Sequence, residues 1–148
     1  MRGSVQFLFD QISQSMAALL PGMLCQPLRA ASHELRRSLR LAFRLASVQQ
    51  RPIVLEPGQT RGAGHLGLRL PEGVRWGRPI TVPLPPSLAN TGWRGGQPHP
   101  ITVTPHRRAA ANVWFLHHGR EALCLQLGLS GAVQLFRYRP LLKAWVEC

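Results

Sequence analysis

The stretch from residue 28 to residue 55 constrains the fold more than any other part of the chain. Its apolar residues recur at spacings of three and four, which places them on one stripe of an α-helix. This predicted core face consists of Leu28, Ala31, Leu35, Leu39, Ala42 and Ala46. Most of the arginines lie off the stripe, so we predict a basic amphipathic helix over residues 28–51. Pro27 suits the first helical turn, and Pro52 disfavours helical geometry at Arg51, where we expect the helix to end.

The hydrophobic period changes from helical to alternating after Pro52. Ile53, Val54 and Leu55 begin this part as the first predicted strand. The same reasoning predicts later strands at residues 66–70, 74–76, 80–84, 101–104, 112–116, 122–127 and 132–136, with an edge strand in 141–148. Gly128–Gly131 is typical of a hairpin turn, and the glycines and prolines of 87–100 predict a long loop. We therefore predict an α+β fold: one long N-terminal helix packed on an antiparallel β-sheet system.

The chain divides into an N-terminal hydrophobic helical segment, residues 1–27, and a globular domain, residues 28–148. The first segment is moderately apolar, but Asp10, Gln11 and Gln14 interrupt it. It therefore lacks the uninterrupted apolar length of an ordinary transmembrane helix. We expect it to continue as helix, with a bend near Pro21 and Gly22.

The charge of the chain points to acidic partners. Eighteen basic residues face only six acidic ones among 148, which gives a formal net charge of +12. This excess favours nucleic acid, anionic lipid heads or acidic protein surfaces, without choosing among them. All the basic residues except Lys143 are arginine, and a GC-rich genome would also enrich arginine, proline and glycine. Charge alone therefore assigns no function.

No residue pattern in the sequence supports catalysis, a metal or a cofactor. His117 and His118 are adjacent, so on a strand their rings point to opposite faces and do not share one ion; we expect exposed turn histidines. Cys124 lies between two leucines, where a small buried residue is ordinary. The six acidic residues form no spaced pair, and no glycine-rich phosphate loop precedes a helix. We expect no enzyme.

The three cysteines, Cys25, Cys124 and Cys148, show neither Cys-x-x-Cys spacing nor a zinc pattern. Cys124 and Cys148 both lie in the C-terminal half. An oxidising compartment would allow one disulfide between them, whereas a reducing one would leave three thiols.

The order of these segments resembles the GspH/FimT family of type IV pilin-like proteins, the minor pseudopilins of type II secretion and pilus assembly. Residues 28–55 are similar to the family's helix, in which a small-residue-plus-Glu-Leu segment leads to Leu-x-x-Ala-x-x-x-Ala and then Arg-Pro-Val. Residues 70–75 resemble its Leu-Pro-x-Gly-Val step, and residues 113–120 and 131–135 resemble its closing strands. The N-terminus departs from the family: Gly3 is followed by Ser-Val-Gln-Phe-Leu, with no glutamate at the fifth place.

The resemblance implies a structural role. Other pseudopilin subunits would be the partners, with the chain associated with the inner membrane and its globular domain in the periplasm. It implies no cofactor and no specific nucleic acid. The alternative is a binding module in which the basic helix contacts nucleic acid or anionic membrane.

Overall fold

The computed structural model describes residues 25–58, 62–88 and 97–148. One helix, α2 (Gln26–Gln49), is followed by β1 (Ile53–Glu56), β2 (His65–Gly67), β3 (Arg75–Trp76), the short 3₁₀ helix η1 (Pro86–Leu88), β4 (Ile101–Val103), β5 (Asn112–His118), β6 (Glu121–Leu127), β7 (Val133–Arg139) and β8 (Ala144–Glu147). This arrangement confirms the α+β class. Residues 1–24, which include Pro21, Gly22 and the predicted N-terminal helical segment, lie outside the described residues. Within the described ranges, no helix has both the length and the apolar character needed to cross a bilayer.

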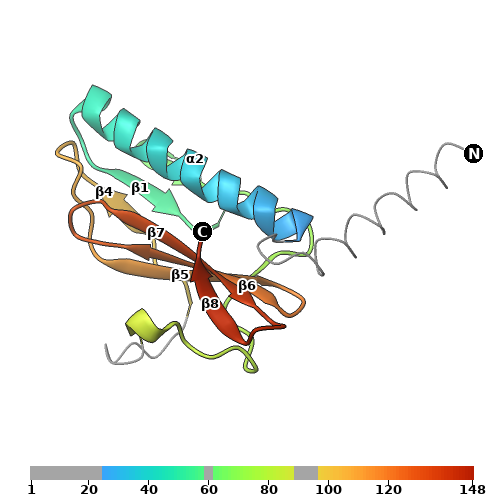
Figure 1. Ribbon diagram of the computed structural model, residues 1–148. Helices are drawn as coiled ribbons and strands as arrows, with labels where there is room; N and C mark the ends of the chain where they lie inside the picture. The colour runs from blue at the N-terminus through green and yellow to red at the C-terminus, as the bar shows by residue number, and fades with distance from the viewer. Residues whose placement is uncertain (1–24, 59–61, 89–96) are drawn as a thin grey trace, which may run out of the picture.

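The strands form two sheets beneath the helix (Figure 1). The smaller has the order β2-β1-β4 and the larger has the order β3-β5-β6-β7-β8. The larger sheet is antiparallel throughout, as predicted. The smaller sheet is mixed, because β1 pairs antiparallel with β4 but parallel with β2. The prediction of a wholly antiparallel system is therefore wrong at β2, where the chain returns in the same direction as β1.

Helix α2 contacts β1 and β4 of the small sheet and β5 and β6 of the large one. All six residues of the predicted core face are at most 2% exposed. They share one apolar core with both sheets, including Ile53, Leu55, Trp114 and Leu125. Each buried leucine side chain contributes on the order of 1.5–3 kcal/mol by leaving water. The buried stripe therefore joins the two sheets into one body.

The limits of α2 differ by two residues from those predicted. The helix begins at Gln26, with Pro27 in its first turn. At its other end Gln50 adopts a left-handed conformation, with φ of 52°, and its N–H binds the carbonyl of Ala46. The helix therefore ends at this left-handed residue, before the position at which Pro52 would disfavour helical geometry.

The start of α2 is held by a distant strand. The backbone N–H of Cys25 donates a 3.2 Å hydrogen bond to Oε2 of Glu121, the first residue of β6. A carboxylate at this end of a helix satisfies a free N–H and complements the helix dipole. Glu121 thus performs the capping role that no residue of the helix's own first turn performs.

The far face of the large sheet is covered by residues 78–88, which we call the strap. A strand was predicted at 80–84, but the strap is irregular: Pro79, Pro83 and Pro85 lack the N–H groups that a ladder requires. Val82 packs against Ala122 and Tyr138. The indole of Trp145 donates a 2.8 Å hydrogen bond to the carbonyl of Pro83. Val82 and Leu84 therefore pack on the sheet without belonging to a strand, and Ile80 does not take part in this packing.

Both faces of the large sheet are covered, and this explains why two adjacent aromatic residues of β5 can both be buried. Trp114 packs in the core beneath the helix, whereas Phe115 packs on the opposite face, with Leu88 and Cys124. Both rings are buried, because each face of the sheet has its own apolar cover.

Candidate functional site

The outer side of α2 is basic. Its five arginines, Arg29, Arg36, Arg37, Arg40 and Arg44, are all exposed. Glu34 binds the guanidinium of Arg37 at 3.0 Å and also accepts a 3.3 Å hydrogen bond from Ser38. Two apolar residues, Leu41 and Val48, also lie on this side of the helix, and they are 37% and 75% exposed. The helix therefore presents cations and apolar side chains together to its surroundings.

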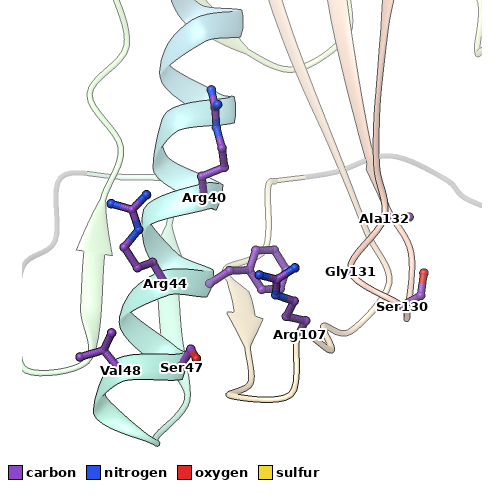
Figure 2. Close-up of a pocket in the computed structure, with 9 residues that line it drawn as sticks. Arg40, Arg44, Ser47, Val48, Arg107, Ser130, Gly131 and Ala132 are labelled. Atoms are coloured by element: carbon purple, nitrogen blue, oxygen red, sulfur yellow. The ribbon is translucent and has the colours of Figure 1, made fainter.

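Near the C-terminal end of α2 this outer side borders a pocket of about 610 Å³, which we call the basic pocket. The helix contributes Arg40, Phe43, Arg44, Ser47 and Val48, and two turns contribute Arg107, Ser130, Gly131 and Ala132. None of these nine described residues is acidic. Figure 2 shows the helix residues on one side and the turn residues on the other, with the side chain of Arg107 extending toward the helix. Arg40 and Arg44 extend away from Arg107 in this view, as expected for cations that repel one another.

The first of the two turns, residues 104–109, fixes the position of Arg107. The N–H of Thr104 binds the carbonyl of Arg108 at 2.8 Å, and the Thr104 hydroxyl bridges to the same residue. Within this closed turn Arg107 has φ of 58°. The left-handed conformation costs an L residue about 1–2 kcal/mol relative to its right-handed counterpart. Arg107 is therefore held at the pocket by a turn that a glycine would form more easily.

The second turn, residues 128–131, connects β6 to β7 as predicted. The N–H of Gly131 binds the carbonyl of Gly128 at 3.0 Å, and Gly131 has φ of 80°. A Cβ at Gly131 would lie 2.6 Å from the carbonyl oxygen of Arg107 and 3.2 Å from the ring of Phe43. Glycine thus allows the two turns and the helix to meet at the base of the pocket.

Cys124 and Cys148, between which an oxidising compartment would allow a disulfide, lie apart on the sheet. Cys25, Cys124 and Cys148 are all free thiols. Cys124 packs with Phe115 on the face covered by the strap. The backbone of Cys148 binds that of Leu135, whose side chain lies in the core beneath the helix. Strand β7 separates the two cysteines, so a bridge would require the sheet to open.

The surroundings of the three cysteines favour the protonated thiol. Burial and a hydrogen bond with Glu121 raise the pKa of the Cys25 thiol to about 12, although Nδ1 of His118 lies only 3.7 Å from its sulfur. Burial raises the pKa of Cys124 to about 12, and burial likewise raises the pKa of Cys148. A protonated thiol does not attack a substrate or bind a metal well.

The two histidines were expected in an exposed turn, but both belong to β5 and are half-buried. Nδ1 of His117 lies 3.0 Å from the carbonyl of Gly77, whereas His118 contacts Cys25. Their partners are thus separate. In the described part of the chain, no three His, Cys, Asp or Glu side chains gather in a way that could hold a metal ion.

Sequence reasoning identified the arginines of the helix but missed Arg107, Ser130 and Gly131 as their neighbours. The spacing of glycines at 128 and 131 was a readable signal for the turn, but nothing in the sequence connects that turn to residues 104–109. Comparisons with protein-family models, with curated proteins and with solved structures find no match to this chain.

Proposed function

We propose that this chain is a structural subunit of the pilin-like type, a minor pseudopilin of a type II secretion system or of a type IV pilus. The observation that carries the proposal is the two-sided character of α2. One stripe of the helix is buried on the sheets, while the other carries five exposed arginines with Leu41 and Val48. A helix with an exposed, partly apolar side is suited to packing beside the helices of neighbouring subunits.

The sequence adds support through the resemblance at residues 28–55, where the helix leads into the first strand. In the structure Gln50, Arg51 and Pro52 lie between α2 and β1, so the junction is a short, direct connection. In such a subunit the helix would contribute contacts for assembly, and the sheets and strap would be displayed in the periplasm.

The test is site-directed photo-crosslinking of the full chain in a bacterium that carries a type II secretion system. A photo-reactive residue at Val48, 75% exposed on the helix, should produce cross-links to pilin-like subunits. The same residue at Ile80, 99% exposed on the strap, is the matched control and should not. Fractionation should place the chain with the inner membrane, and its globular domain should be accessible to protease in spheroplasts.

Residence in the cytoplasm, with no cross-link from Val48, would overturn the proposal.

The second candidate function is a binding module for nucleic acid or anionic membrane. The arginines of α2 favour it, because cations spaced along an exposed helix can contact successive phosphates. A salt titration of binding to a mixed-sequence DNA duplex separates the two. A pseudopilin should bind the duplex weakly and release it at about 150 mM salt, whereas submicromolar binding that persists at this salt concentration would favour the second function.

A further inference from the structure

The basic pocket combines two kinds of surface that a simple anion site does not need together. Its cations come from α2 and from the turn at 104–109, and its remaining lining includes the aromatic ring of Phe43 and the side chain of Val48. Leu129, in the turn beside Ser130, is 70% exposed. A volume of about 610 Å³ is within the range of pockets that hold drug-sized ligands, and it far exceeds the needs of one phosphate ion.

The arginines of the pocket have few competing partners. Nε of Arg40 donates a 3.3 Å hydrogen bond to the carbonyl of Arg36, within its own helix. The ion pairs of Arg37 with Glu34 and of His65 with Glu56 both lie outside the pocket. A guanidinium presents N–H groups in a planar fork that matches a carboxylate through two parallel hydrogen bonds. The pocket therefore has cationic groups ready for a carboxylate ligand.

The chain itself is a poor source of that ligand. It has six acidic residues, of which Glu34, Glu56 and Glu121 already bind partners within the fold. Two copies, each with a formal charge of +12, also repel one another. Charge complementarity thus indicates a different chain rather than a second copy.

We propose that the basic pocket binds a segment of another protein in which carboxylate side chains flank an apolar residue. Arg40, Arg44 and Arg107 bind the carboxylates, and the apolar residue packs against Phe43 and Val48. Under the proposed function, on which this assignment rests, the segment belongs to a neighbouring subunit of different sequence. A nucleic acid backbone would meet the same arginines but would leave the apolar lining without a contact, so it fits the pocket less well.

The test measures direct binding of a labelled synthetic peptide, with two glutamates on either side of a leucine, to the purified full chain. The double variant Arg44→Ala/Arg107→Ala should weaken binding at least about tenfold, since it removes two groups that form charge-assisted hydrogen bonds with carboxylates. The matched control is Arg69→Ala/Arg120→Ala. It removes the same two charges from exposed residues that do not line the pocket. Replacing the peptide's glutamates by glutamine should abolish binding, and replacing its leucine by serine should weaken it.

Equal losses in both double variants would overturn the inference, because they would show binding to the overall charge. A short DNA duplex that competes fully with the peptide at about 150 mM salt, or a leucine-to-serine peptide that binds unchanged, would do the same. The result is independent of photo-crosslinking. Peptide binding without cross-links to pilin-like subunits would refute the proposed function alone, and cross-links without peptide binding would refute the pocket's assignment alone.

Discussion

Replacing Gly131 by alanine tests how the two turns meet. Gly131 has φ of 80°, and a Cβ there would lie 2.6 Å from the carbonyl oxygen of Arg107. The obstacle is backbone, so it cannot rotate away as a flexible side chain would. Two other glycines allow the cost of the left-handed conformation to be separated from the cost of the steric overlap. Gly119 has φ of 61° with nothing near its Cβ position, and the Cβ position of Gly128 meets only the carbonyl of Ala132 at 3.8 Å.

The expected costs follow from these differences. At Gly119 the left-handed conformation costs alanine about 1–2 kcal/mol, and the smaller freedom of the unfolded chain returns about 0.4–1 kcal/mol. Gly119→Ala should therefore lower the free energy of unfolding by about 1 kcal/mol. Gly131→Ala adds an overlap that forces the turns apart, for which overpacking costs of about 1–3 kcal/mol are typical, giving about 2–4 kcal/mol in total. Gly128→Ala has neither the left-handed cost nor an overlap, so it should retain only the unfolded-chain effect and raise the free energy of unfolding by about 0.4–1 kcal/mol.

Urea denaturation of the three variants measures these values, provided that the slope with denaturant stays the same. Gly131→Ala should also weaken peptide binding at the basic pocket, whereas Gly119→Ala should leave it unchanged. Equal destabilisation by Gly119→Ala and Gly131→Ala would refute the reasoning, because only the second variant brings a new atom against the turn of Arg107.

Three further predictions concern the helix and the thiols. Leu39→Ala should cost about 2–5 kcal/mol in chemical denaturation, because Leu39 is 2% exposed, whereas Arg40→Ala at the exposed next position should cost little. Glu121→Ala should lower stability by about 1 kcal/mol and speed hydrogen exchange in the first turn of α2; exchange that accelerates equally along the whole helix would contradict its capping role. The folded pKa of Cys25 and Cys124 is raised from 9.0 to about 12, so above pH 9 the unfolded chain loses thiol protons that the folded chain keeps. The free energy of unfolding should therefore fall as the pH rises from 9 towards 12, and it should fall less steeply in Cys124→Ala.

The helix could be predicted from the sequence because its signal is local. Six small or aliphatic residues at helical spacing specify both the element and its buried face, whatever lies beneath. Its ends were harder to place, since the start depends on Glu121 from β6 and the finish on the left-handed conformation of Gln50. Neither feature can be read from residues 28–51 alone.

The strap shows where alternation misleads. Ile80, Val82 and Leu84 alternate like a strand, yet Ile80 is 99% exposed and Val82 is 1% exposed. Val82 and Leu84 pack on the sheet whereas Ile80 lies in solvent, so the apolar alternation does not correspond to one buried face, and the prolines around Val82 prevent pairing. The parallel β1–β2 pair was missed for a related reason: strand direction depends on the path of the connecting loop, which hydrophobic periodicity does not record.

The basic pocket could not be predicted, because its residues come from three separate segments that meet only in the fold. Arg40 and Arg44 belong to a visible helical pattern, but Arg107 is one of two adjacent arginines in a short turn. Its left-handed φ, the feature that distinguishes it from Arg108, is a property of the folded backbone. A GC-rich genome would account for many arginines in this chain, but it would not account for an arginine in a conformation that favours glycine.

That conformation gives the decisive test of whether Arg107 has a function. In Arg107→Gly, relief of the left-handed strain of about 1–2 kcal/mol exceeds the entropy cost of glycine in the unfolded chain, about 0.4–1 kcal/mol, so stability should rise by about 0.5–1 kcal/mol. Lys143 has φ of 50° in the turn between β7 and β8 and does not line the pocket, so Lys143→Gly is matched in both conformation and charge. Both variants should raise the urea midpoint, but only Arg107→Gly should weaken peptide binding. If Arg107→Gly stabilised the chain and bound the peptide as well as the original, the arginine would be a product of base composition, and the basic pocket would lose one of its three cations as a functional group.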